Sequence, residues 1–309
     1  MVTGFVCGGV EGVEMVGLTS LLKRIRHPLG ASHPNVETIQ GMDDLKRKTD
    51  FLRVFLASSN GHVDKVGIES VLYDIENEKG VLGRAVHIGD GSLLTALHVI
   101  RPVGLQLVQQ LRQGQKEKYA KKFEVVEYDA NNDVALLRMH DYENTEKPLI
   151  QLGNRVPQLG ETVSEFVRVY GSMGSDYIFQ FKWEDAYYSS DTYGLGRIIL
   201  PANSHFLEKQ GEVRYNRDNT PSNSTYRENC FYAPIPTLEG DSGSPIFLRV
   251  ADDKYVFVGI LSRSYGTRHP LRNKRGYFTG AVIVDRGPIE RLILQYLSKS
   301  IQTPHLSVP

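Results

Sequence analysis

A serine in residues 238–245, which read Leu-Glu-Gly-Asp-Ser-Gly-Ser-Pro, has the surroundings of an exposed nucleophile. A serine hydroxyl is a poor nucleophile at neutral pH, so Ser242 would need a general base within hydrogen-bond reach and a third group that orients the base. The sequence offers both: His98 follows the mainly apolar run 93–97, and Asp133 precedes the apolar run 134–137. These three residues can together perform acyl transfer.

Three short segments carry these residues: Thr-Ala-Leu-His at 95–98, Asp-Val-Ala-Leu-Leu at 133–137 and Gly-Asp-Ser-Gly-Ser-Pro at 240–245. In this order they resemble the signatures of the trypsin/chymotrypsin-like (PA clan) serine proteases. Each segment alone fits an ordinary turn, cap or core histidine, but three in order, each beside an apolar strand, argue against coincidence. Leu97 and Ser244 replace the family's usual alanine and glycine. These variants resemble disulfide-poor viral or bacterial members rather than secreted digestive ones.

The resemblance implies a serine endopeptidase that cleaves peptide bonds through an acyl-enzyme, and it leaves open the processing of a polyprotein. Ser242 would be the nucleophile, His98 the base and Asp133 the orienting group, while the backbone N–H groups of Gly240 and Ser242 would form the oxyanion hole. This chemistry needs no cofactor, and the sequence lacks metal ligands at usable spacing. The alternative is a catalytically silent binding module of the same fold, against which the intact triad argues.

Substrate selection is expected at a cleft built from residues near the nucleophile. Pro236 stands where the family places the base of its primary specificity pocket, and an aspartate there would select Lys or Arg. We therefore expect a polypeptide substrate with a non-basic P1 residue. The other expected substrate-binding residues are Thr237, Glu239, Ser262, Arg263, Ser264 and Gly276. Ser262 also matches the family serine that lies near the triad aspartate, and the cationic stretch 263–275 is either a solvated loop or a surface that attracts acidic substrates.

Activation by cleavage is a further question that the resemblance raises. In zymogens of the family, a freed N-terminus pairs with the aspartate before the nucleophile, here Asp241. The segment Lys65-Val66-Gly67 is a faint echo of such a cleavage site, although Val66 is closer to His98 than the family interval and the usual glycine pair is missing. The alternative is that Asp241 finds donors within the chain.

The strand pattern predicts an all-β protein, and the resemblance implies two six-stranded antiparallel β-barrels followed by a C-terminal helix. Short β-branched and aromatic runs cut by Gly and Asn/Asp begin near residue 70. We expect an N-terminal, partly helical extension or pro-segment over 1–64, barrels over 65–152 and 153–286, and a helix and tail over 287–309. The helix would bury Ile289, Leu292, Ile293, Tyr296 and Leu297. The polar stretch 201–230 is expected to be a long surface loop.

Charge and cysteine content limit the partners. Lys and Arg total 36, as do Asp and Glu, so no net field would draw the chain to nucleic acid or to an anionic membrane. The N-terminus lacks the pattern of a signal peptide, and Cys7 and Cys230 are the sole cysteines. Two free thiols and a Cys7–Cys230 bridge both remain open. These features favour an intracellular location, in a host or bacterial cytoplasm, over secretion, and they leave the oligomeric state open.

Overall fold

The computed structural model describes residues 46, 49–57, 61–77, 80–100, 110–113, 117–121, 123–140, 142, 150–168, 197–199, 206–213, 229–235, 237, 240–265 and 280–302. All of them lie in the unit Asp44–Pro309. Residues 1–43 of the expected N-terminal extension lie outside the described residues. Within the described residues, no helix has the length and apolar content needed to cross a membrane.

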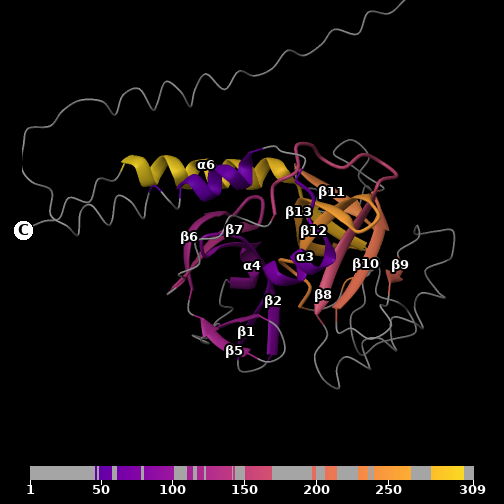
Figure 1. Ribbon diagram of the computed structural model, residues 1–309, viewed down its shortest axis with the longest axis horizontal. Helices are drawn as coiled ribbons and strands as arrows, with labels where there is room; N and C mark the ends of the chain where they lie inside the picture. Colours follow the sequence, from indigo (N-terminus) through magenta and orange to yellow (C-terminus); the bar gives the residue numbers. More distant parts are fainter. Residues whose placement is uncertain are drawn as a thin grey trace, which may run out of the picture. The chain divides into compact units, whose positions relative to one another are not determined.

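The first sheet has seven antiparallel strands among the described residues, in the order β5-β4-β1-β2-β3-β7-β6. Figure 1 labels β1, β2, β5, β6 and β7 of this sheet. Its strands are β1 (Leu72–Asn77), β2 (Gly80–Gly89), β3 (Ser92–Ala96), β4 (Gln110–Gln113), β5 (Glu117–Lys121), β6 (Phe123–Asp129) and β7 (Val134–Met139). Every residue of β3 and β7 is buried. Close packing around these two buried strands therefore holds the residues at their ends in place.

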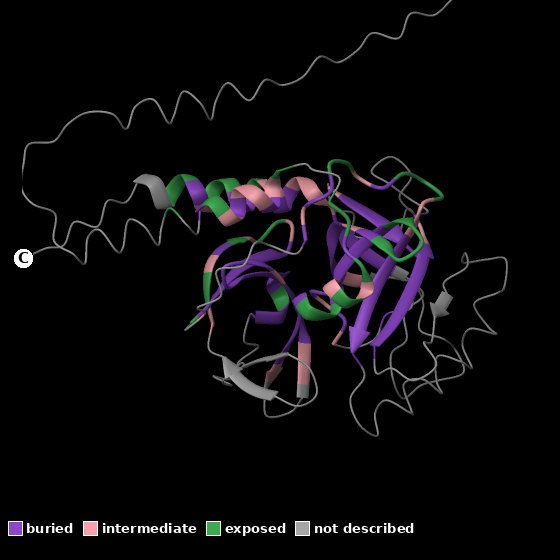
Figure 2. Cartoon of the chain, in the orientation of Figure 1, coloured by how far each residue is buried: buried purple, intermediate pink, exposed green. Residues whose placement is uncertain are grey.

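The second sheet also has seven antiparallel strands, in the order β11-β14-β13-β12-β8-β10-β9. Its strands are β8 (Thr162–Arg168), β9 (Arg197–Ile199), β10 (Phe206–Glu212), β11 (Cys230–Ala233), β12 (Pro245–Ala251), β13 (Lys254–Tyr265) and β14 (Gly280–Val284). The predicted all-β, two-barrel fold class is confirmed, and among the described residues each sheet has seven strands where the resemblance implied six. Figure 2 shows most of the ribbon of both sheets buried.

The described part of the chain includes the helices α3 (Lys65–Val71), α4 (Leu97–Ile100) and α6 (Arg286–Gln302). The C-terminal helix α6 contacts β6 and β7 of the first sheet. Its predicted apolar face is confirmed, because Ile289, Leu292, Ile293 and Leu297 are buried and Tyr296 packs against the same core. Residues 49–56 are helical, and Leu52 and Phe55 belong to that core. Cys230 lies buried in β11, and Cys7 lies outside the described residues.

Two details of the predicted secondary structure are wrong. Ser70 and Val71 end helix α3 instead of beginning a strand, because Asp64 caps that helix by accepting the N–H of Gly67 at 2.7 Å. Residues 206–212, expected within a surface loop, form β10 in the interior of the second sheet. Their polar side chains concealed this, since Glu208, Lys209 and Gln210 are buried with polar or charged partners.

Candidate active site

Two adjacent strands bring His98 and Asp133 together. In the antiparallel pair of β3 and β7, Ala96 at the end of β3 lies opposite Val134 at the start of β7. His98 follows β3 in helix α4, and Asp133 precedes β7 in a turn whose backbone N–H groups at Asn131 and Asn132 donate to Asp129. The Leu97 N–H also donates to the Asp133 carbonyl at 3.0 Å. The sheet register therefore determines the proximity of His98 and Asp133.

The Asp133 carboxylate accepts three hydrogen bonds. Oδ1 accepts the backbone N–H of His98 at 3.0 Å, and Oδ2 lies 2.8 Å from His98 Nδ1 and accepts the Ser262 hydroxyl at 2.5 Å. Burial is the strongest single influence on the pKa of Asp133 and raises it, but the hydrogen bonds from His98 and Ser262 outweigh burial and bring the pKa below its ordinary 3.8. Asp133 is therefore a carboxylate at neutral pH, and it can only accept from His98.

The contact with Asp133 uses Nδ1 of the His98 ring and leaves Nε2 available to accept a proton. Since the carboxylate must accept, Nδ1 of His98 carries the proton in the neutral ring and Nε2 is the basic nitrogen. The His98 side chain is 48% exposed, whereas the Asp133 side chain is only 7% exposed. A buried anion thus orients an accessible base.

Ser242 lies in a tight loop, residues 240–244, that leads into β12. The loop closes on itself through a hydrogen bond from the Ser244 N–H to the Asp241 carbonyl at 3.0 Å. Gly240 and Gly243 have φ angles of 91° and 85°, which side chains disfavour. A Cβ on Gly243 would lie 2.1 Å from the Arg84 carbonyl oxygen and 3.2 Å from the Ala96 nitrogen. The residue after Ser242 is thus packed against the strand end that leads to His98.

Strand β13 connects this loop to Asp133. The Gly243 N–H donates to the Leu261 carbonyl at 2.7 Å, and the Leu261 N–H donates to the Ser244 carbonyl at 2.9 Å. The next residue, Ser262, donates to Asp133. Two consecutive residues of one strand therefore hold the serine loop and the aspartate in a fixed relation to each other.

Ser242 itself is half-buried, and its hydroxyl makes no hydrogen bond to His98 among the described contacts. Such bonds are often long or absent before a substrate is bound. Within the part of the chain that is described, the backbone N–H groups of Gly240 and Ser242 donate to no other group. These two donors remain available to an incoming oxygen atom.

The expected substrate-binding residues are only partly described. Thr237 is buried, Ser262 contacts Asp133, and Arg263 is half-buried on β13. Ser264 pairs with Ala281 through the backbone of β13 and β14. Pro236, Glu239 and Gly276 lie outside the described residues. Of this group, Ser262 is the member that the structure brings to His98 and Asp133.

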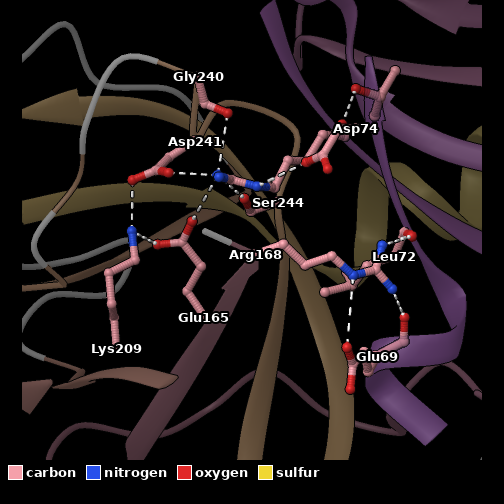
Figure 3. Close-up of polar contacts among 11 residues, drawn as sticks. Glu69, Leu72, Asp74, Glu165, Arg168, Lys209, Gly240, Asp241 and Ser244 are labelled. Carbon is pink, nitrogen blue, oxygen red and sulfur yellow. Dashed lines mark hydrogen bonds and ion pairs between the residues drawn. The ribbon is translucent and has the colours of Figure 1, made fainter. Parts of the chain in front are cut away.

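Sequence reasoning missed a buried group of charged residues behind the serine loop. Arg84 of β2 and Lys209 of β10 pair with Asp241. Figure 3 shows Lys209 between Asp241 and Glu165 of β8. One local feature of the sequence could have indicated this group. Arg84 is a charged residue within the mainly apolar segment 81–88, and such a residue needs a buried partner.

Comparison with known proteins identifies one family model, described as a trypsin-like peptidase domain, which matches residues 83–260. Solved structures that resemble the chain include the Rv3671c protease of M. tuberculosis. Its active form is 14% identical with a TM-score of 0.46, covering 75% of this chain and 82% of that chain. An inactive form is 16% identical with a TM-score of 0.44, covering 75% and 91%. No curated protein matches the sequence.

Proposed function

The chain belongs to the trypsin-like peptidase family and is a serine peptidase, and from this premise we propose that it is an endopeptidase that uses Ser242, His98 and Asp133 as its catalytic triad. The observation that carries the proposal is the hydrogen-bonded arrangement of Asp133, His98 and Ser262 beside the glycine-bounded loop of Ser242. A base that is oriented by a buried carboxylate and adjacent to a serine is the arrangement that activates a hydroxyl.

In the proposed reaction, Ser242 Oγ attacks the carbonyl carbon of a peptide bond while His98 Nε2 takes the hydroxyl proton. Asp133 stabilises the imidazolium that forms and keeps Nδ1 protonated. His98 then gives the proton to the leaving amine, the C–N bond breaks, and an acyl-enzyme remains on Ser242. Water, deprotonated by His98, attacks the ester, which releases the new carboxyl terminus and restores the serine.

The oxyanion of each tetrahedral intermediate would be bound by the backbone N–H groups of Gly240 and Ser242. Two observations support this role: neither group donates elsewhere in the described part of the chain, and the φ angle of Gly240 is 91°. Donors that are fixed before the reaction stabilise the developing charge without reorganisation, and one such donor contributes on the order of 3 kcal/mol in the transition state.

For the substrate we propose a polypeptide with a non-basic P1 residue, because Pro236 stands at the base of the expected pocket in place of the aspartate that would select Lys or Arg. An unpaired Lys or Arg side chain in a desolvated pocket is costly. Thr237 follows Pro236 in the chain and is buried, and Arg263 is a half-buried cation on β13. Profiling on a peptide library tests the proposal, and a clear preference for Lys or Arg at P1 would refute it.

The catalytic proposal is tested by labelling the protein with a fluorophosphonate probe and measuring peptide cleavage. We expect stoichiometric labelling of the native chain, none for Ser242→Ala, and cleavage that Ser242→Ala or His98→Ala reduces by several orders of magnitude. Circular dichroism checks that the variants fold. A native protein that is folded but is neither labelled nor active would instead support the binding-module alternative.

A further inference from the structure

A cluster of buried charges lies directly behind the proposed nucleophile. Asp241, the residue before Ser242, is 1% exposed and is met by two cations from different sheets (Figure 3). Arg84 Nη1 of β2 donates to Asp241 Oδ1, and Lys209 Nζ of β10 donates to Oδ2 at 2.5 Å. Both carboxylate oxygens of Asp241 therefore have a cationic partner supplied by the folded chain.

The two cations are themselves held by other buried carboxylates. Arg84 lies opposite Asp74 in the β1–β2 register, and its Nε is 3.3 Å from Asp74 Oδ1. Lys209 Nζ is 2.7 Å from Glu165 Oε2. Asp74 and Glu165 thus hold Arg84 and Lys209 in position, and both cations also contact Asp241. They can therefore hold Asp241 in place.

Arg84 contacts the serine loop at nearly every residue. Its Nη1 also donates to the Gly240 carbonyl at 3.1 Å and to Ser244 Oγ at 3.4 Å, and its backbone N–H donates to the Ser242 carbonyl at 2.8 Å. Gly83 makes this approach possible, because a Cβ there would lie 2.6 Å from the Ser242 carbonyl oxygen. One residue of the first sheet therefore fixes the peptide planes that flank the proposed oxyanion donors.

The faint cleavage site seen in the sequence has a different role in the structure. Lys65 and Val66 lie in the first turn of α3, which Asp64 caps. The Lys65 side chain pairs with buried Glu208 at 2.8 Å, and its backbone N–H donates to Asp253 at 3.4 Å. Cutting the bond after Lys65 would separate the helix from its cap while Asp241 already has its cations.

We propose that Arg84 and Lys209 are positioning residues that act as built-in counter-ions of Asp241 and hold residues 240–244 ready for catalysis while the bond between Lys65 and Val66 stays intact. The proposal rests on the proposed function of Ser242. When zymogens of the family are cleaved, a freed N-terminal ammonium pairs with the aspartate before the nucleophile, and here two internal side chains would form that pair. The proposal also explains why two cations and three acidic side chains are buried at one place.

The first test compares Arg84→Met with Arg138→Met. Arg138 is a matched control, since it is equally buried in the same sheet and pairs with Asp90 at 3.3 Å, without a described contact to the serine loop. We expect similar losses of thermal stability, a fall in kcat of about 100-fold for Arg84→Met with little change in KM, and near-native kcat for Arg138→Met. Arg84→Lys, which keeps the charge, should recover part of the loss.

Should Arg84→Met not fold, Lys209→Met and Asp241→Asn supply the same comparison from the other members of the cluster. The fold-reduction in kcat of the double variant Arg84→Lys/Asp241→Asn should be smaller than the product of the fold-reductions of the two single variants. The reason is that both substitutions disturb the same interaction. Equal kcat values for folded Arg84 or Lys209 variants and the native protein would overturn the proposal.

The second test asks which form of the chain reacts with the fluorophosphonate probe. Intact-mass measurement should find the probe on the uncut 309-residue chain, and Lys65→Gln should be labelled at the native rate. Labelling that appears only on a chain beginning at Val66 would overturn the proposal while leaving Ser242 as the nucleophile. Absence of labelling on cut and uncut chains alike would instead refute the proposed function.

Discussion

Asp133 holds His98 with both of its carboxylate oxygens, Oδ1 through the backbone N–H at 3.0 Å and Oδ2 through ring Nδ1 at 2.8 Å. The first bond fixes where helix α4 begins relative to β7, and the second fixes the ring orientation and its tautomer. Asp133 therefore has a structural and a chemical task at once. Substitutions can separate the two.

Asp133→Asn should lower kcat by about 10⁴-fold with a modest loss of stability. Asparagine can still accept the backbone N–H, and it tolerates the φ angle of 58° at this position. It can also donate to His98 Nδ1, which favours the wrong tautomer and leaves no stabilising charge. Steady-state kinetics together with thermal melting measure both effects.

Asp253→Asn is the control for this substitution, because Asp253 has a φ angle of 51° in an exposed turn. Its kcat should match the native value. If both asparagine variants lost activity equally, the effect at Asp133 would not arise from its contact with His98.

Ser262→Ala should make the protein more sensitive to acid. The lowered pKa of Asp133 means that its contribution to stability is present above 3.8 and is lost as pH falls through its folded-state pKa. Removing the Ser262 hydrogen bond raises that pKa, so the acid-unfolding midpoint should shift to higher pH. The loss at neutral pH should be about 1–2 kcal/mol. Denaturant unfolding across the acidic range measures it, and an unchanged midpoint would mean that the bond contributes nothing.

The family resemblance, and no pattern in the sequence, implied the two barrels, whereas local patterns predicted the strands, helix α6 and the segments that carry His98, Asp133 and Ser242. Each belongs to or borders an apolar segment whose pattern is local, such as 134–137 or 289–297. Antiparallel pairing of β3 with β7 then brings the ends of two such segments together. Local patterns and a shared order of motifs were enough for this part of the site.

Strand β10 and the charged cluster could not be predicted in the same way. Lys209 reads as a solvated residue until Glu165 and Asp241 are placed beside it, and these partners are distant in the sequence. Glu208 likewise depends on Ser164, Tyr255 and Lys65. The burial of a charge is determined by a long-range pair, which no periodicity within one segment reveals.

Gly243→Ala should destabilise the protein by more than about 4 kcal/mol and abolish activity. A methyl group there would overlap the Arg84 carbonyl oxygen at 2.1 Å and the Thr95 hydroxyl at 2.4 Å, in addition to the unfavourable φ angle of 85°. Neither neighbour can move freely, because Thr95 donates to Arg84 and lies in the buried strand β3. Soluble yield, melting temperature and probe labelling measure the result.

Gly160→Ala isolates the backbone part of this effect. Gly160 has a φ angle of 83°, but a Cβ there would meet no atom within 4 Å. Its cost should be about 1–2 kcal/mol, with native kcat. Equal destabilisation by the two substitutions would show that the packing against β2 and β3 does not matter.

Glu165 should give the protein a stability that declines as the pH rises. Burial, followed by the charge of Asp241, raises the pKa of Glu165 from 4.5 to about 7, against the opposing influence of Lys209 and Arg84. A raised folded-state pKa favours the folded protein while the group is protonated. Its contribution is therefore complete below pH 4.5 and is lost as the pH rises through about 7.

Glu165→Gln mimics the protonated side chain, so its free energy of unfolding should lack this decline. Relative to the variant, native stability should fall with pH by up to about 1.4 kcal/mol per unit between the two pKa values. Glu161→Gln is a control in which the pH dependence should have the opposite sign. The hydrogen bond from Arg155 lowers the pKa of Glu161, so the contribution of Glu161 to the free energy of unfolding is lost only as the pH falls. Urea unfolding at several pH values measures all three proteins. Parallel pH profiles for native protein and Glu165→Gln would mean that Glu165 stays ionised, and that Asp241 and Glu165 share the two cations as a fully charged cluster.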